Sequence, residues 1–102
     1  MNKVMFIGRV ANDVDYNEEK KYARFSLAVN EKTKDGEKVH YANHVAFGKT
    51  AEYVAKYVKK GAKLYLGSRF NQNQEKREQY SFIIEEIEFL SEKKDKEEFP
   101  FE

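Results

Sequence analysis

The segment from Tyr41 to Thr50 constrains the fold of this chain most, because a strand pattern there runs directly into a helix start. Side chains alternate between the two faces of a strand. One face of this strand carries Tyr41, Asn43, Val45 and Phe47. The opposite face carries His40, Ala42, His44 and Ala46. The chain must therefore fold with a helix immediately after a strand that presents two aromatic rings on one side.

Periodicity and turn residues predict five strands and one helix. Alternating apolar and polar residues indicate strands at 3–10, 23–30, 38–47, 63–66 and 79–90. Residues 12–21 and 71–78 are polar and are expected to be loops, and Asp35-Gly36 marks a hairpin turn. The helix is expected to start at the N-cap hydroxyl of Thr50 and to close at Gly61. Its apolar stripe consists of Ala51, Val54, Ala55 and Val58.

This order of elements predicts the fold class. A single short helix between strands 3 and 4 of an all-β chain is the arrangement of the five-stranded oligonucleotide-binding (OB) barrel. The 102 residues suffice for one domain. We expect residues 1–90 to form the barrel and residues 91–102 to form a short acidic C-terminal tail.

Composition excludes several classes of protein. The chain has no cysteine, so neither a disulfide framework nor a thiolate metal site is available. The apolar run near the N-terminus is cut off by Gly8 and Arg9, which makes it too short for a signal peptide or a membrane span. A cytoplasmic protein without membrane contact is expected.

The net charge of +1 gives weak support for a nucleic-acid ligand. Its distribution is uneven, however. Residues 91–102 hold three lysines against five acidic residues, a net −2, so residues 1–90 carry +3. A modest surplus of this size can still bind phosphate where the cations cluster.

The strand face with Tyr41 and Phe47 suggests a platform for unpaired bases. Bases stack on aromatic rings regardless of identity, at about 1–3 kcal/mol each, and nearby lysines such as Lys49 hold phosphates. Asn43 on the same face could hydrogen-bond a base or the backbone. The alternative is that both rings belong to the core.

Four motifs in order give a more specific resemblance: Asn2–Arg9, Ala23–Asn30, Val45–Glu52 and Tyr57–Gly61. With them the chain resembles bacterial single-stranded DNA-binding proteins, which coat unwound strands. The resemblance implies that Phe47 stands in the place of a base-stacking phenylalanine and Tyr41 in that of a stacking tryptophan. It also implies that Lys49 and Lys60 contact phosphate.

Two further tryptophans of that family fall here at Thr33 and Glu75, and this chain has no tryptophan. Loss of two stacks would cost about 2–6 kcal/mol of binding free energy. Phe70 and Tyr80, close to the last hairpin, are the candidate replacements. The expected phosphate contacts are Lys3, Arg9, Lys49, Lys60, Arg69, Lys76 and Arg77.

The end of the chain resembles the acidic tip with which that family docks replication and repair proteins. The residues concerned are Glu97, Glu98, Phe99, Pro100 and Phe101. Here Glu102 follows Phe101, and a solvated acidic end without a docking role is the alternative. The resemblance also implies a homotetramer, with a dimer possible, and a nucleoid-associated location.

Enzymatic interpretations find little support. His40 and His44 share a strand face but have no third ligand nearby, so packing or a subunit contact is the better account. The acidic run Glu85, Glu86 and Glu88 lacks any accompanying nuclease motif, and no phosphate-binding glycine loop occurs. We expect no enzymatic activity, no cofactor and no metal.

Two functions remain open from the sequence. The first is non-catalytic, largely sequence-independent binding of single-stranded DNA during replication, recombination or repair. The second is an OB-fold protein-interaction module of a primosome or mobile element, with weak nucleic-acid binding. RNA also remains open as a ligand, since stacking alone does not exclude a 2′-hydroxyl.

Overall fold

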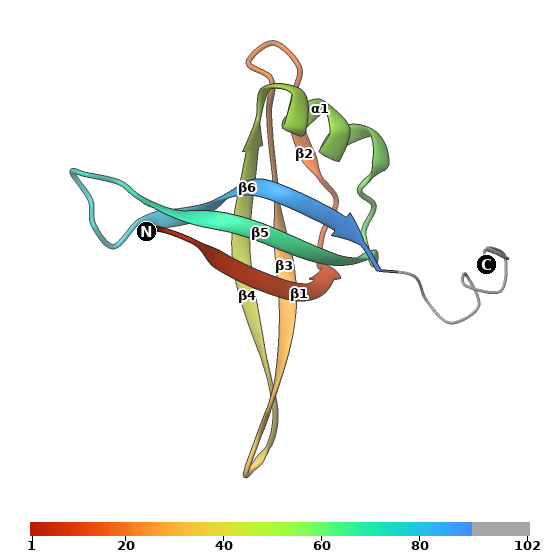
Figure 1. The fold of residues 1–102 in the computed structure, drawn as a ribbon, viewed down its shortest axis with the longest axis vertical. Helices are drawn as coiled ribbons and strands as arrows, with labels where there is room; N and C mark the ends of the chain where they lie inside the picture. The colour runs from red at the N-terminus through yellow and green to blue at the C-terminus, as the bar shows by residue number, and fades with distance from the viewer. Residues whose placement is uncertain (91–102) are drawn as a thin grey trace, which may run out of the picture.

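A computed structural model describes residues 1–90 of the chain. Its elements, in order, are β1 (Val4–Val10), β2 (Asp15–Asn17), β3 (Tyr22–Thr33), β4 (Gly36–Phe47), α1 (Gly48–Tyr57), β5 (Lys63–Gln72) and β6 (Tyr80–Phe89). Figure 1 shows β1, β5 and β6 crossing the long β3–β4 hairpin, with α1 at one end of the barrel. No helix within these 90 residues is long and apolar enough to cross a membrane.

The strands form one closed sheet in the order β1-β5-β6-β4-β3-β2. The sheet closes because the end of β1 also pairs with β3, where Arg9 lies opposite Ala28 and Val10 opposite Leu27. β4 and β6 pair in parallel at His44–Phe82 and Val45–Ile83, whereas the other pairings are antiparallel. The predicted five-stranded OB barrel with one helix is therefore confirmed, and its five strands are β1, β3, β4, β5 and β6.

One prediction about the chain between β1 and β3 was wrong. Residues 12–21, expected to be a loop, contain the short strand β2, in which Tyr16 lies opposite Ala23 of β3. A three-residue strand with one large apolar side chain leaves almost no periodic signal in the sequence. The strand forms because its backbone pairs with β3.

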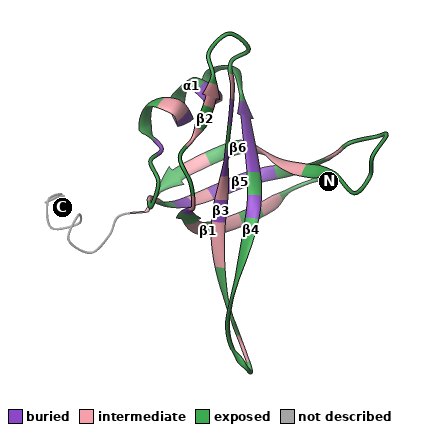
Figure 2. Cartoon of the chain, turned by 180° about the vertical axis from the view of Figure 1, so that it is seen from behind, coloured by how far each residue is buried: buried purple, intermediate pink, exposed green. Residues whose placement is uncertain are grey.

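The β3–β4 hairpin extends well beyond the barrel. Its register runs from Tyr22–Phe47 at the barrel to Thr33–Gly36 at the tip, and Gly36 has φ +123°, which favours glycine. The predicted turn is thus confirmed. Figure 2 shows that the outer half of this hairpin is exposed, while its inner half carries buried residues over the barrel.

The core lies inside the barrel and beneath α1. Leu27 of β3 and Leu64 and Leu66 of β5 are fully buried, as is Val54 of the helix. His44 is also fully buried, with ring centroids 5.1 Å from Phe6, 6.1 Å from Phe25 and 5.5 Å from Phe82.

The helix begins three residues earlier than predicted, with its N-cap at Phe47 instead of Thr50. Phe47 is the N-cap residue, with extended backbone and no side-chain cap, so the N-cap prediction for Thr50 was wrong. Gly48 makes the early start possible because it adopts φ +62° while its N–H donates to the Lys21 carbonyl. Gly61 lies in the turn that follows the helix, at φ +91°, and its N–H donates to the Val10 carbonyl.

Candidate nucleic-acid interface

The predicted alternation along β4 holds at the barrel. Ala42, His44 and Ala46 are buried, whereas Tyr41 is 66% and Phe47 51% exposed. The alternative that both rings belong to the core is therefore wrong. Val45 departs from the pattern: it lies on the same face as the two rings but is buried.

The exposed rings form two small clusters. Phe47 packs against Tyr22 of the neighbouring strand, with ring centroids 5.3 Å apart. Phe70 of β5 and Tyr80 of β6 lie 5.5 Å apart, and each lies 6.1 Å from Phe82. The structure thus brings two of the predicted rings together and gives Phe47 a partner, Tyr22, that was not predicted.

Two adjoining cavities connect these clusters. The first, about 880 Å³, is lined by Tyr41, Tyr80 and Phe82, and we call it the aromatic cavity. The second, about 460 Å³, is lined by Tyr22, Arg24, Ser26, Asn43 and Tyr80 together with Asn12, Asp13 and Asp15, and we call it the polar cavity. Asn43 and Tyr80 line both cavities. The two together form one path across β4, which we call the β4 groove.

Asn43, predicted to be a polar contact, is held in place. Its Oδ1 accepts a hydrogen bond of 2.6 Å from Ser26 Oγ on the adjacent strand. That bond fixes the orientation of the amide. The amide nitrogen of Asn43 forms no hydrogen bond within residues 1–90.

Three predicted cations are close in the chain to groove residues or to the rings beside the groove, although none of the three lines either cavity. Lys49 follows Phe47 by two residues, in the first turn of α1. Lys76 and Arg77 are exposed in the β5–β6 hairpin, just before Glu78 and Gln79 of the aromatic cavity. None of the three forms an ion pair with a carboxylate of residues 1–90. Lys60 is likewise exposed, but it lies beyond the end of α1 and adjoins no cavity-lining residue in the chain.

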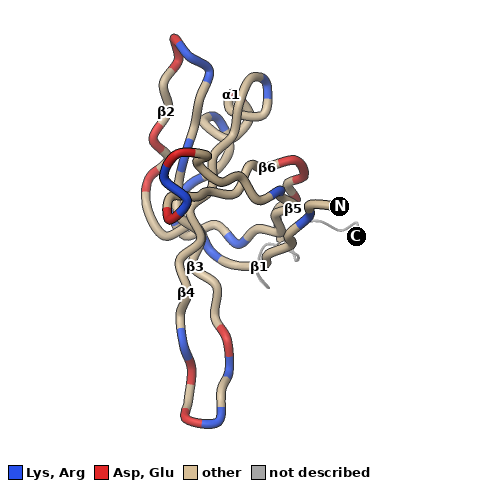
Figure 3. The backbone as a smooth tube through the Cα atoms, turned by 90° about the vertical axis from the view of Figure 1, so that its left-hand side faces the viewer, with Lys and Arg blue, Asp and Glu red and all other residues tan. Residues whose placement is uncertain are grey.

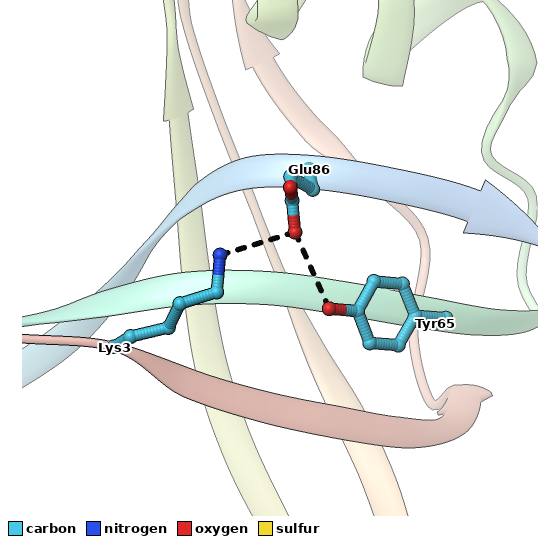
Figure 4. A network of polar contacts seen from close by, with 3 residues as sticks. All are labelled: Lys3, Tyr65 and Glu86. Atoms are coloured by element: carbon cyan, nitrogen blue, oxygen red, sulfur yellow. Dashed lines mark hydrogen bonds and ion pairs between the residues drawn. The ribbon is translucent and has the colours of Figure 1, made fainter.

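Other predicted cations are already engaged. Lys3 Nζ lies 3.2 Å from Glu86 Oε1, and that carboxylate also accepts a 3.3 Å hydrogen bond from the Tyr65 hydroxyl (Figure 4). The hydrogen bond and charge of Glu86 raise the pKa of Lys3. Arg69 lies 3.5 Å from Glu85, and Arg9 donates to the Gly61 carbonyl at 3.1 Å. None of these three lines the groove.

The outer hairpin mixes both signs of charge. Figure 3 shows basic and acidic residues interspersed along the part of the β3–β4 hairpin that leaves the barrel. His40 lies in this part, with Nε2 2.7 Å from Glu31 Oε1. His44 is buried instead, and desolvation lowers its pKa to about 4 against a weaker opposing hydrogen bond to the Ala42 carbonyl. The two histidines therefore belong to different environments, and residues 1–90 contain no cluster of metal-ligating side chains.

Sequence reasoning missed several groove residues. Tyr22 was detectable, because counting back from the hairpin turn places it opposite Phe47. Asn12, Arg24 and Ser26 carry no signal of this kind, since their role depends on how the β1–β2 loop meets β3. The predicted tail residues, Glu97 to Phe101, lie outside the described part of the chain.

Comparison with known proteins fits this geometry. The family described as the Single-strand binding protein family matches residues 1–90. The chain belongs to this family. Single-stranded DNA-binding proteins of Fusobacterium nucleatum and Clostridium perfringens are each 34% identical, over 87% and 88% of this chain. The chain spans 66% of the length of each of these two relatives.

Two solved structures have a similar fold. The Plasmodium falciparum SSB in complex with ssDNA has a TM-score of 0.71 and 25% identity, covering 89% of this chain and 96% of that one. The mitochondrial single-stranded DNA binding protein Rim1 of S. cerevisiae has a TM-score of 0.67 at 22% identity, covering 87% and 93%. The similarity to Rim1 supports the fold alone.

Proposed function

We propose that this protein binds single-stranded DNA without catalysing a reaction. The observation that carries the proposal is the β4 groove: exposed Tyr41 and Tyr80 line it, Phe47 packs against Tyr22 of its lining, and Phe70 packs against Tyr80. Aromatic rings along a groove, together with nearby cations, are what sequence-tolerant single-strand binding requires. A structural neighbour in this family, the P. falciparum protein, is in complex with ssDNA.

Phosphate neutralisation falls chiefly to Lys49, Lys76 and Arg77. These cations are near the groove and have no carboxylate partner within residues 1–90. Lys60 follows them, since it is exposed but lies beyond the end of α1, away in the chain from the cavity-lining residues. Lys3, Arg9 and Arg69 rank last, because each would first have to leave its present contact.

Titration of a labelled oligo-thymidine with the protein, followed by fluorescence anisotropy at several salt concentrations, tests this function. Three phosphate contacts predict a slope of log affinity against log salt of about −2, at roughly 0.7 per contact for a single strand. A duplex of equal length is the control and should bind much more weakly. Flat curves for the single strand at low salt would contradict the proposal.

A second function is favoured by one specific observation. Thr33 and Glu75 stand where the resemblance places two stacking tryptophans, and Thr33 lies at the exposed hairpin end. With those stacks absent, an interaction module of a primosome or mobile element with weak nucleic-acid binding becomes the alternative. The same titration separates the two functions, because only the first requires salt-sensitive affinity for the single strand.

We further propose that the protein assembles as a homotetramer, or as a dimer. Met5 and Ile7 on the outer face of β1 are 65% and 56% exposed, flanking the polar network around Glu86. From Val4 to Gly8, β1 pairs with β5 alone among the described strands, which leaves one strand edge open. Light scattering should give a multiple of the chain mass of 12.1 kDa, and a monomer at micromolar concentration would contradict assembly.

The biological setting belongs to the proposal as well. A non-catalytic role in replication, recombination or repair and a cytoplasmic, nucleoid-associated location accord with family membership. Docking of replication or repair proteins on Glu97 to Phe101 is tested by direct binding of a peptide of residues 94–102 to a helicase or nuclease. The absence of binding across several such partners would remove the docking role.

A further inference from the structure

The polar cavity differs in chemistry from the rest of the β4 groove. The aromatic cavity offers rings, but the polar cavity places two aspartates, two asparagines and an arginine around a space of about 460 Å³. A site that held only stacked bases and phosphates would need neither the amides nor the carboxylates. The polar lining therefore suits a ligand that has hydrogen-bond donors and acceptors on one edge.

Ser26 organises the cavity before any ligand arrives. Its N–H donates to Asn12 Oδ1 at 2.9 Å, its carbonyl accepts from the Ala11 N–H at 2.8 Å, and its hydroxyl donates to Asn43 Oδ1 at 2.6 Å. These three bonds tie the β1–β2 loop and β4 to β3. The loop residue Asp13 is thereby carried on a fixed support, which lowers the entropy lost on binding.

The hydrogen bonds also determine which atoms remain available. Asn12 and Asn43 both use their side-chain oxygens, so their amide nitrogens are left as donors. Arg24 uses Nε to bond Asp15 at 3.1 Å, which leaves the other guanidinium nitrogens as donors. Asp13 is the one carboxylate lining the cavity that has no side-chain partner within residues 1–90.

We propose that the polar cavity binds one guanine of the DNA strand and gives the protein a preference for that base. Asp13 accepts the two parallel N–H groups of the guanine edge, N1–H and N2–H, and the Asn43 amide donates to O6. Tyr80, which lines both cavities, flanks the base. The inference rests on the proposed single-strand binding and adds base selectivity to it.

Guanine matches the cavity better than the other bases do. It alone offers a carboxylate two parallel N–H donors from one edge, and bidentate pairing of a charged group is strong and geometrically selective. Thymine offers one such donor, while adenine and cytosine offer only the hydrogens of one amino group. A phosphate does not fit the site, because Asp13 and Asp15 would repel it.

The test uses oligo-thymidines in which one central position is thymine, guanine, inosine or adenine, titrated at fixed salt. Guanine should bind about tenfold more tightly than thymine, in the range expected for one good bidentate contact. Inosine lacks the N2 amino group and should lose most of that gain. Adenine should remain close to thymine.

Asp13→Asn should abolish the preference for guanine, so that oligonucleotides with guanine or thymine at the central position bind with equal affinity. The matched control is Glu19→Gln, which removes one charge from the exposed β2–β3 turn and should keep the preference. Equal affinity for all four oligonucleotides would overturn the guanine site and leave the proposed function standing. A preference that survives Asp13→Asn would overturn this cavity as its origin. Absence of binding to every oligonucleotide would overturn the proposed function, and the guanine site with it.

Discussion

The β4 groove and the outer face of the β1–β5–β6 sheet both hold cations expected to contact phosphate, but they hold them differently. Near the groove, Lys49 has no carboxylate partner among residues 1–90, whereas on the sheet face Lys3 is joined to Glu86 and Arg69 to Glu85. A paired cation must give up its partner before it can bind phosphate. The presence of lysines and arginines therefore does not by itself define a nucleic-acid surface. Whether each cation is already paired with a carboxylate determines whether it is available to phosphate.

One ionisable ring is buried in the barrel interior, on the strand that carries the groove. The groove wall contains His44, whose imidazole is buried among Phe6, Phe25 and Phe82. Its Nε2 has no hydrogen-bond partner within residues 1–90. His44 is the only buried histidine in that range. Acid should therefore act on the fold through the strand that also carries the groove.

The largest expected effect is on stability in acid. The pKa of His44 falls from its usual 6.5 to about 4 on folding, so the unfolded chain takes up the proton first as the pH falls. The free energy of unfolding should be at its full value above pH 6.5 and decline towards pH 4, by about 3 kcal/mol at most. Urea unfolding at pH 7, 5.5 and 4 measures this.

Two variants isolate the contribution of that histidine. His44→Phe should remove its part of the acid sensitivity, because no ring is left to be protonated. His40→Phe, at the exposed position paired with Glu31, should leave the sensitivity as it is. If both variants kept the wild-type pH profile, the buried ring would not be its source.

The next effect concerns the stacking rings. Phe47→Ala should weaken binding of every single-stranded sequence by about 1–3 kcal/mol, roughly five- to more than a hundredfold, because stacking does not depend on base identity. Tyr57→Ala removes an equally exposed ring, on α1 rather than at the groove, and should leave affinity unchanged. Anisotropy titrations measure the affinity of both variants for the single strand. Equal losses of affinity would show that binding depends on exposed aromatic area in general and not on the groove.

A third prediction compares a cation near the groove directly with a paired one. Lys49→Ala should reduce the magnitude of the salt slope by about 0.7 and lower affinity several-fold, because one phosphate contact is lost. Lys3→Ala should change neither the salt slope nor the affinity, since Lys3 forms an ion pair with Glu86 on the β1–β5–β6 face. Equal slopes for the two variants would remove the distinction between the regions.

Much of the fold could be predicted from local sequence patterns. Which lysines and arginines pair with carboxylates could not be predicted in this way. Alternation and turn residues located the five barrel strands and the single helix. The Lys3–Glu86 contact joins residues 83 positions apart, so it depends on how β1, β5 and β6 align. A register shift between Gly67 and Ser68 changes that alignment, and nothing in the sequence marks where the shift falls.

The site shows the same division. Exposure of Tyr41 and Phe47 follows from strand alternation, but burial of Val45 on that face does not, because it lies where β6 pairs with β4 opposite Ile83. Likewise, the early helix start depends on the positive φ of Gly48 and its bond to Lys21, a residue of the distant β2–β3 turn. Contacts between elements overrode local sequence at each of these points.

The smallest effect should come from the paired face itself. A Cβ at Gly67 would lie 2.5 Å from Glu86 Oε1 and 3.1 Å from the Tyr65 hydroxyl, so Gly67→Ala must push the Glu86 carboxylate off the strand. Because the Lys3–Glu86 pair is exposed and screened by solvent, its loss should lower the free energy of unfolding only slightly. Single-strand affinity should stay constant while light scattering reports whether assembly through this face weakens. A large loss of affinity with assembly intact would mean that the β1–β5–β6 face contacts DNA after all, and the contrast between the two regions would have to be abandoned.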